Sequence, residues 1–208
     1  MTNYQLCADR ENIQRFITEI TKDWHQFSDQ AGKFEIRCLG EHRTPTTQIF
    51  TLETVAEAVD FAIQMNTSKL NVYMTINPID PKAVIKAGKG ATNKDILRAH
   101  YSFADADDLQ GLDGLIRLSG KQKPDITVTT GTVPHARQHA YWHLAEPCND
   151  LELWEATQRR IAIEFKTDKS VVNPSRLMRL PGTVSFPTMN KQKKGYDPEL
   201  VTMQLGVN

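Results

Sequence analysis

The chain has 208 residues, enough for one large domain or two small, closely packed modules that bury most of their apolar surface. It carries 25 basic and 25 acidic residues, so its net charge is about zero, which excludes recruitment of a polyanion by a global positive field. No stretch approaches the roughly 18 apolar residues of a membrane span, and Met1 to Arg10 lacks a signal peptide's apolar core, so we expect a soluble, cytoplasmic protein without a membrane partner.

The first part of the chain alternates between helical and extended patterns. The expected elements are a helix with apolar positions from Ile13 to Phe27, strands at 34–38 and 46–50, a helix over 55–63 after a cap at Thr51, and a strand at 70–76. Residues 77–94 are rich in Pro, Gly, Lys and Asn and predict a long loop. This loop divides the chain into an N-terminal α/β module over 1–94 and a second module over 95–208.

The second part predicts a split βαβ unit. The expected elements are a strand at 100–107, a helix at 109–119, strands at 126–130 and 139–144, a helix at 150–166 and a strand at 176–180. This βαββαβ order predicts one antiparallel sheet with both helices on one face. Right-handed crossovers place the first and third strands side by side in its centre, so residues 100–107 and 139–144 are expected to be neighbours.

Two carboxylates are predicted to share one face of the strand at 100–107. Because strand side chains alternate, Asp105 and Asp107 project from the same face, whereas the small residues around them face the helices. Carboxylates held in this way favour Mg²⁺ or Mn²⁺, which bridge phosphate oxygens in phosphoryl transfer. An isolated Asp-x-Asp is more often a solvated turn or a cap, and Asp108, directly before the helix at 109–119, fits a cap.

A histidine begins the adjacent strand. Alternation places His139, Tyr141 and His143 on one face of that strand and an apolar set on the other. If the first set shares the face of the carboxylates, His139 lies beside the metal site and can hydrogen-bond a phosphate oxygen. Without that pair, a half-exposed strand histidine with no special role is the more frequent outcome.

Three further residues are candidates for metal or phosphate binding. Asp168 follows the helix at 150–166 and can reach the same face as a third ligand, although a turn residue is more common there. Arg176 and Arg179 precede Leu-Pro-Gly, and a guanidinium fork suits a triphosphate, although such arginines are more often surface charges. The segment KAGKGATNK at 86–94 lacks the Walker A pattern and predicts a solvated basic loop that can contact a nucleic-acid backbone.

Four segments, as an ordered set, resemble the primase-polymerases of phages and mobile elements, within the archaeo-eukaryotic primase superfamily. They are NVYMTINP (71–78), YSFADADD (101–108), ITVTTG leading to QHAYWHL (126–144), and NPSRLMRLPGT (173–183). The resemblance implies an α+β fold, an RNA-recognition-motif-like βαββαβ antiparallel sheet packed with an N-terminal α/β module. This fold agrees with the order of elements expected from the residues.

The resemblance also assigns roles to residues. The metal ligands it implies are Asp105, Asp107 and Asp168, and the nucleotide-binding residues are His139, Arg176 and Arg179. Two positions depart from the pattern. Relatives commonly carry a short Ser-Gly-x-Gly turn before the histidine strand, where this chain has TVPHARQ, and many have an acid in place of Asn173.

The activity implied is template-dependent nucleotidyl transfer with Mg²⁺ or Mn²⁺, on a DNA template and primer and from nucleoside triphosphates. A replicative helicase is a further candidate partner. Two other functions stay open. One is a non-catalytic module that binds single-stranded nucleic acid by stacking bases on Tyr101, Phe103 and Tyr141. The other is a metal-dependent nuclease, which uses the same acids and needs no triphosphate clamp.

Extension of a primer is expected to be easier for this chain than initiation, because initiation must order an additional free nucleotide. The three cysteines form no CxxC pair or cysteine–histidine cluster. After Gly182 about 26 residues follow, fewer than a typical appended domain. The visible candidates for further backbone contact are Lys191, Lys193 and Lys194, which predict a modest, salt-sensitive affinity.

Overall fold

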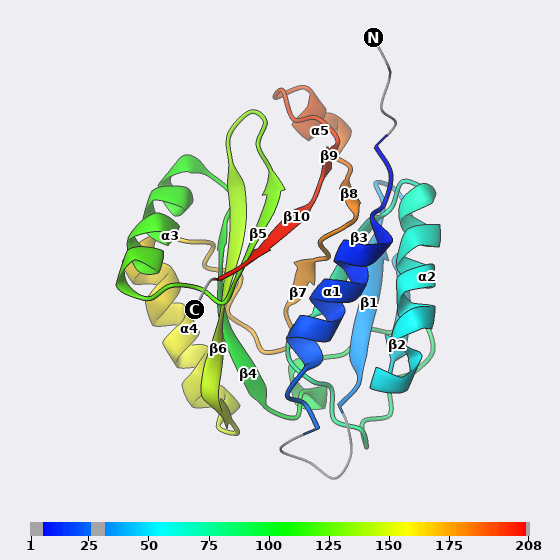
Figure 1. Cartoon of the computed structure of the whole chain (residues 1–208), viewed down its shortest axis with the longest axis vertical. Helices are drawn as coiled ribbons and strands as arrows, with labels where there is room; N and C mark the ends of the chain where they lie inside the picture. The colour runs from blue at the N-terminus through cyan, green and yellow to red at the C-terminus, as the bar shows by residue number, and fades with distance from the viewer. Residues whose placement is uncertain (1–5, 26–31, 207–208) are drawn as a thin grey trace.

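Two four-stranded antiparallel sheets, each with its own helices, and a small two-stranded sheet of β8 and β9 form the described part of the protein (Figure 1). The computed structural model describes residues 6–25 and 32–206. Its elements are α1 (Arg10–Thr21), β1 (Phe34–Leu39), β2 (Thr46–Phe50), α2 (Val55–Thr67), β3 (Asn71–Thr75), β4 (Ala99–Ala106), α3 (Leu109–Lys121), β5 (Ile126–Gly131), β6 (Arg137–Cys148), α4 (Leu151–Phe165), β7 (Leu177–Arg179), β8 (Val184–Ser185), α5 (Met189–Gln192), β9 (Glu199–Leu200) and β10 (Thr202–Leu205). The mixed α and β content and the antiparallel sheets confirm the predicted fold class.

The first sheet has the order β2-β1-β3-β7, and α1 and α2 cover one of its faces (Figure 1). The inward side chains of β1 and β3 are apolar and fully buried, in line with the alternation in the sequence. Thr51 begins a short 3₁₀ turn that leads into α2, and the helix α1 ends at Thr21, earlier than predicted. Phe27, expected at the end of that helix, lies outside the described residues.

The second sheet has the order β10-β5-β6-β4. The predicted pairing of residues 100–107 with 139–144 is confirmed, since β4 pairs with β6 in antiparallel register. The helix α3 packs on one face of this sheet, where Ala104, Ala106 and Trp142 form a core with it. The helix α4 does not share that face as predicted: it lies along the outer edge of β4, and its Trp154 packs against Phe103. The predicted cap is also present, because the Asp108 side chain accepts a hydrogen bond from the Gly111 amide at the start of α3.

The strand expected at 176–180 was placed in the wrong sheet. β7 pairs with β3 of the first sheet, where Arg179 lies opposite Tyr73, so β4 is an edge strand and is not central. The opposite edge of the second sheet is extended by β10, which pairs with β5. The chain therefore crosses between the sheets again after α4, and the division of the chain at residue 94 stays a prediction.

The helix α4 explains why no strand pairs with the free edge of β4. Three outward carbonyls of that edge accept hydrogen bonds: Tyr101 from Trp154 Nε1 (3.1 Å), Phe103 from Gln158 Nε2 (2.8 Å), and Asp105 from the Asp168 amide (2.8 Å). An edge whose acceptors are satisfied in this way has little to gain from another strand. The last of these bonds also fixes the backbone of Asp168 beside Asp105.

One hydrophobic core joins the two sheets through α1. Phe16 of α1 lies edge-on to Tyr141 of β6 with ring centroids 5.9 Å apart, and the Tyr101 hydroxyl donates to the Glu19 carbonyl (3.1 Å). Tyr101, Phe103 and Tyr141 are only 1%, 2% and 0% exposed. The face of the second sheet that carries them is therefore covered, whereas base stacking on these rings, one of the functions left open by the sequence, needs it exposed.

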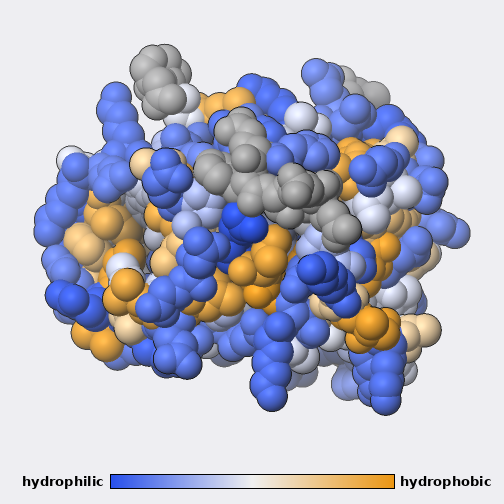
Figure 2. Space-filling model, turned by 90° about the horizontal axis from the view of Figure 1, so that it is seen from below, coloured by the Kyte–Doolittle hydropathy of each residue, from blue (hydrophilic) through white to orange (hydrophobic). Residues whose placement is uncertain are grey.

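The surface mixes hydrophilic and hydrophobic residues. On the face that Figure 2 shows, hydrophobic residues lie in patches separated by hydrophilic ones. The large exposed apolar side chains include Leu109 and Ile116 of α3 and Leu153 and Ile163 of α4. Within the described ranges, no helix is both long and apolar enough to cross a membrane.

Candidate functional site

A pocket of about 270 Å³ lies where β4 and β6 of the second sheet meet β3 and β7 of the first. The segment 185–196, which contains α5, contributes another wall. The lining includes Asn71, Tyr73, Asp105, Asp107, Thr130, Arg137, His139, Asp168, Arg176, Arg179, Lys191 and Tyr196. All six residues singled out from the sequence as metal or nucleotide ligands are thus in one pocket.

Three carboxylates converge in this pocket. Asp105 and Asp107 come from the end of β4 and its exit, and Asp168 follows α4. One ligand oxygen from each carboxylate lies within 4.8 Å of the others. Asp105 is buried, Asp107 is exposed and Asp168 is half-buried, so the cluster has one side toward solvent. The Asp168 amide donates a hydrogen bond to the Asp105 carbonyl (2.8 Å), and the Asp168 Oδ1 accepts one from the Ser170 amide (2.8 Å).

Asp105 is the carboxyl group of the cluster that burial makes costly to ionise. Its Oδ1 is buried and forms no hydrogen bond within the described residues, an arrangement that is costly for a polar atom. Desolvation, followed by the negative charges of Asp107 and Asp168, raises the pKa of Asp105 to about 8. A divalent cation would supply the missing partner, and three carboxylates are the hard oxygen ligands that Mg²⁺ and Mn²⁺ prefer. The residues present therefore fit a divalent metal ion.

His139 is buried beside the carboxylates, and is not half-exposed. It is 5% exposed, and its Nδ1 lies 3.1 Å from the Tyr141 hydroxyl, within hydrogen-bond distance. Burial, with smaller effects of Arg179 and Arg176, lowers the pKa of His139 to about 3, so the ring is neutral at pH 7. His139 Nε2 lies 3.6 Å from Asp105 Oδ1, which is too long for a hydrogen bond. Because the ring is neutral and Asp105 is protonated up to about pH 8, this is a contact between neutral groups over much of the pH range.

The two arginines reach the pocket from β7 of the first sheet, which carries Arg179, and from the loop before β7, which carries Arg176. Arg179 of β7 donates from Nη1 to Asn71 Oδ1 (2.7 Å) and from Nη2 to the Tyr73 hydroxyl (2.9 Å). Arg176 donates from Nη1 to the Ser170 carbonyl (3.3 Å), while its buried Nε has no hydrogen-bond partner within the described residues. Because their immediate hydrogen-bond partners are uncharged, both guanidinium groups keep their positive charge available in the pocket.

A second group of lining residues surrounds Tyr196 and was not predicted from the sequence as part of the site. The Arg137 guanidinium lies 4.6 Å from the Tyr196 ring centroid, and Lys191 Nζ lies 5.4 Å from it. Arg137 also pairs with Glu199 (Nη2 to Oε1, 3.0 Å). Alternation along β6 would have placed Arg137 on the face of His139, whereas nothing in the sequence pattern places Lys191 or Tyr196 here.

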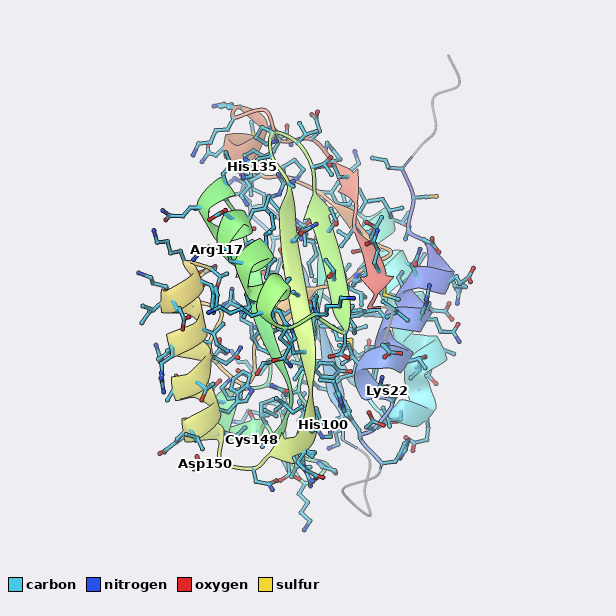
Figure 3. All side chains as sticks on the ribbon, turned by 60° about the vertical axis from the view of Figure 1, so that its left-hand side comes forward. Lys22, His100, Arg117, His135, Cys148 and Asp150 are labelled. Carbon is cyan, nitrogen blue, oxygen red and sulfur yellow. The ribbon has the colours of Figure 1, made fainter. Side chains whose placement is uncertain are left out.

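Glu199 also binds the loop between β5 and β6, where this chain has TVPHARQ in place of the short turn common in the resembled family. Its carboxylate accepts from the Thr132 amide (2.6 Å), the Thr132 hydroxyl (2.5 Å) and the Val133 amide (3.2 Å). Figure 3 shows His135 at the end of the same hairpin, next to α5, and its ring centroid is 5.8 Å from that of Tyr196. The longer loop is thus tied to the C-terminal wall of the pocket.

Asn173, the other departure, is not among the residues that line the pocket of the carboxylates. Its Nδ2 donates to Asn93 Oδ1 (3.3 Å) and Ser175 Oγ (3.1 Å). An acid at this position is therefore not needed to complete the cluster, because Asp168 already occupies the third place.

Comparisons with known proteins identify the fold. No protein-family model matches the chain, and no curated protein matches its sequence. The AEP domain (PP-N190) of the primase-polymerase of cyanophage S-2L is similar in structure, with a TM-score of 0.63 and 20% identity over 96% of this chain and 91% of that chain. The catalytic domain of primase RepB′, in complex with initiator DNA, has a TM-score of 0.57 and 16% identity over 93% of this chain and 84% of that chain.

A further structure of primase RepB′ has a TM-score of 0.60 and 16% identity, and the match covers 94% of this chain but only 55% of that longer chain. At these identities the likeness shows the fold. The chain has the archaeo-eukaryotic primase fold of primase-polymerase domains, as the four sequence segments predicted.

Proposed function

We propose that this chain is a primase-polymerase that carries out template-dependent nucleotidyl transfer from nucleoside triphosphates to the 3′-hydroxyl of a primer. The observation that supports the proposal is the composition of one pocket, in which three carboxylates lie against a neutral histidine and two available arginines. The similarity in fold to primase-polymerase domains supports nucleotidyl transfer in general. The RepB′ catalytic domain in complex with initiator DNA supports DNA as the polynucleotide.

The carboxylates of Asp105, Asp107 and Asp168 would hold Mg²⁺ or Mn²⁺, which when bound neutralises charge on the reacting phosphate oxygens. Asp105 must lose its proton to act as a ligand, because only the carboxylate binds a cation. The exposed side of Asp107 leaves room for the α-phosphate and the primer hydroxyl next to the cluster. The buried side, at Asp105, keeps the cluster in one geometry.

The two arginines and His139 bind the triphosphate. Arg176 and Arg179 offer positive charge, and hydrogen bonds to charged groups of this kind are the stronger ones in proteins. Burial raises the pKa of Tyr141, so its hydroxyl stays protonated and is able to donate to His139 Nδ1 across their 3.1 Å contact; the proposal requires this one of the two tautomers that the contact allows. His139 then carries its proton on Nε2, toward the pocket, and donates it to a phosphate oxygen without adding charge.

The two other functions are less well supported. Base stacking on Tyr101, Phe103 and Tyr141 would require exposed rings, and all three are buried in the core between the sheets. A metal-dependent nuclease would use the same carboxylates. It would have no use for Arg176 and Arg179 aimed at the same pocket, because a phosphodiester carries less clustered charge than a triphosphate.

One assay separates the three functions. The protein is incubated with a labelled primer on a DNA template, with Mg²⁺ or Mn²⁺, and with ribonucleotides or deoxyribonucleotides in turn. Extension of the primer that depends on metal, template and nucleotide supports the proposal. Shortening of the primer supports the nuclease, and retention of the DNA without either change supports the binding module; both of these results contradict the proposal.

A further inference from the structure

The face of the first sheet turned away from α1 and α2 carries a row of cations and an aromatic ring. Thr47 of β2 lies opposite Arg37 of β1, Arg37 lies opposite Tyr73 of β3, and Tyr73 lies opposite Arg179 of β7. Residues opposite one another on antiparallel strands project from the same face. The row therefore crosses the whole sheet and ends at Arg179, inside the pocket of the carboxylates.

A hollow of about 400 Å³ lies over the middle of this row, at Arg37 and Tyr73. Its lining includes Arg37, Leu39, Tyr73, Asn173, Ser175 and Arg176. Tyr73 and Arg176 line both this hollow and the pocket of the carboxylates, so the two spaces meet at these side chains. We call the hollow and the row beneath it the sheet groove.

Arg37 is held in place at the floor of the groove. Glu35 is fully buried; its Oε1 accepts from Arg37 Nε and its Oε2 from the Ala91 amide (2.6 Å). The backbone at Gly90 packs so closely that a Cβ there would lie 1.5 Å from Arg37 Nη2. Within the described residues Arg37 donates hydrogen bonds from Nε alone, and its side chain is 27% exposed, so further donors of the fork face the groove.

The spacing of the row suits a flexible polyanion with flat bases. Neighbouring strands are about 4.8 Å apart, so Arg37 and Arg179, two strands apart, are separated by about 10 Å, with the Tyr73 ring between them. The Arg179 guanidinium lies over one face of that ring, 4.8 Å from its centroid, so the other face is the one offered to a base or sugar. Alternation of cations with an aromatic ring is how surfaces that bind single-stranded nucleic acid hold both phosphates and bases. No acidic side chain is among the residues that line the hollow.

We propose that the sheet groove binds single-stranded nucleic acid next to the pocket, with Arg37 on a backbone phosphate and Tyr73 on a base or sugar. This inference rests on the proposed function, because it makes the groove the path by which the template strand reaches the reacting nucleotide. Contacts of this kind are to the backbone and to ring faces, so binding is independent of sequence and sensitive to salt.

Thr47 offers a test that leaves the core untouched, since it lies on the edge strand β2, next to Arg37 and outside the pocket. Fluorescence anisotropy with a labelled oligothymidylate, in EDTA and without nucleotide, measures binding apart from catalysis. Thr47→Lys should tighten binding and steepen the slope of log K against log salt by about 0.7, the value for one added phosphate contact on a single strand. Thr47→Glu should weaken binding severalfold at low salt.

Matched variants on the other side of the sheet serve as controls. Thr18 is exposed on α1, and neither Thr18→Lys nor Thr18→Glu should change the affinity. Arg37→Gln should weaken binding about 10-fold, whereas Arg117→Gln on α3, labelled in Figure 3, should not. Arg37→Gln leaves the buried Glu35 without its cation and can unfold the protein. If that variant does not fold, the Thr47→Lys and Thr47→Glu variants decide the test.

The outcomes separate this inference from the proposed function. Opposite shifts for the two Thr47 variants, with unchanged Thr18 variants, support the groove, whether or not the wild-type protein extends a primer. Equal affinities for both Thr47 variants overturn it even when extension is robust. Shifts that are as large for the Thr18 variants, or that occur only with duplex DNA, also overturn it.

Discussion

His139 lies directly opposite Asp105 across the β4–β6 ladder, with His139 Nε2 3.6 Å from Asp105 Oδ1. The Asp105 carbonyl points away from β6, to the Asp168 amide, so this is a non-hydrogen-bonded pair, the kind that brings side chains closest. Strand pairing thus places a neutral histidine against the buried carboxyl group of Asp105, and the hydrogen bond from the Asp168 amide at the edge of β4 brings in the third acid.

The carboxylates should be individually required for nucleotidyl transfer. Asp107→Asn and Asp168→Asn each remove the charge of a proposed metal ligand. Mutation of a residue that only hydrogen-bonds to a metal ligand typically lowers activity by roughly 10–100-fold, so we expect loss of a ligand itself to lower the rate of primer extension by more than that. Asp108→Asn is the matched control, since asparagine also caps α3 well and Asp108 is outside the cluster. Extension at the wild-type rate by either ligand variant would refute the assignment.

Asp105 should make the metal-free protein less stable as the pH rises. An aspartate ordinarily ionises near 3.8, whereas Asp105 in the folded state stays protonated up to about pH 8. Between these values the folded state binds one more proton than the unfolded chain, so the stabilisation is complete below pH 3.8 and is lost as the pH rises through 8.

The variant Asp105→Asn removes this proton linkage. In EDTA it should gain at least about 1 kcal/mol relative to wild type between pH 5 and pH 8.5, or about 2–4 °C in unfolding midpoint. Thermal unfolding of both proteins across this pH range measures the difference. The contributions of all other titrating groups are the same in the two proteins and cancel when their midpoints are subtracted. A difference between the two midpoints that does not change with pH would contradict the burial of an unpaired carboxyl at this position.

Arg179 should contribute to nucleotide affinity. Its guanidinium is positioned by Asn71 and Tyr73, both uncharged, so its charge is free to meet a triphosphate. Arg179→Ala should weaken nucleoside triphosphate binding by about 10-fold or more, since hydrogen bonds to charged groups are worth about 1.5–3 kcal/mol. Isothermal titration without DNA measures this, with Arg117→Ala on α3 as the control. Unaltered affinity in the Arg179 variant would remove it from the nucleotide site.

We expect any side chain at position 114 to destabilise the packing of α3 against the end of α4. A Cβ there would lie 1.5 Å from the Phe165 carbonyl oxygen, so Gly114→Ala must push the helices apart at a cost of about 1–3 kcal/mol. Gly120 in the same helix has nothing within 4 Å, and Gly120→Ala should be neutral or stabilise by up to about 1 kcal/mol. Thermal unfolding that ranks the two variants in the opposite order would show that the helices are not packed in this way.

The sequence by itself determined the elements and which side chains share a face. Asp105 and Asp107 lie together, and the strand that begins near His139 pairs with theirs, because strand alternation and the βαββαβ order are local properties of the chain. The motif of Arg176 and Arg179 likewise pointed to the pocket that the two arginines line. Arg137 was within reach of the same alternation and was overlooked.

Only the tertiary structure decided where β7 pairs, how deeply Asp105 is buried and that Lys191 and Tyr196 line the pocket. Each depends on segments far apart in the chain. β7 joins the first sheet because side chains of α4 and the Asp168 amide already satisfy the free edge of β4. Asp105 lies buried in the pocket where β3 and β7 of the first sheet meet β4 and β6, and its desolvation depends on that packing and not on neighbours in the sequence.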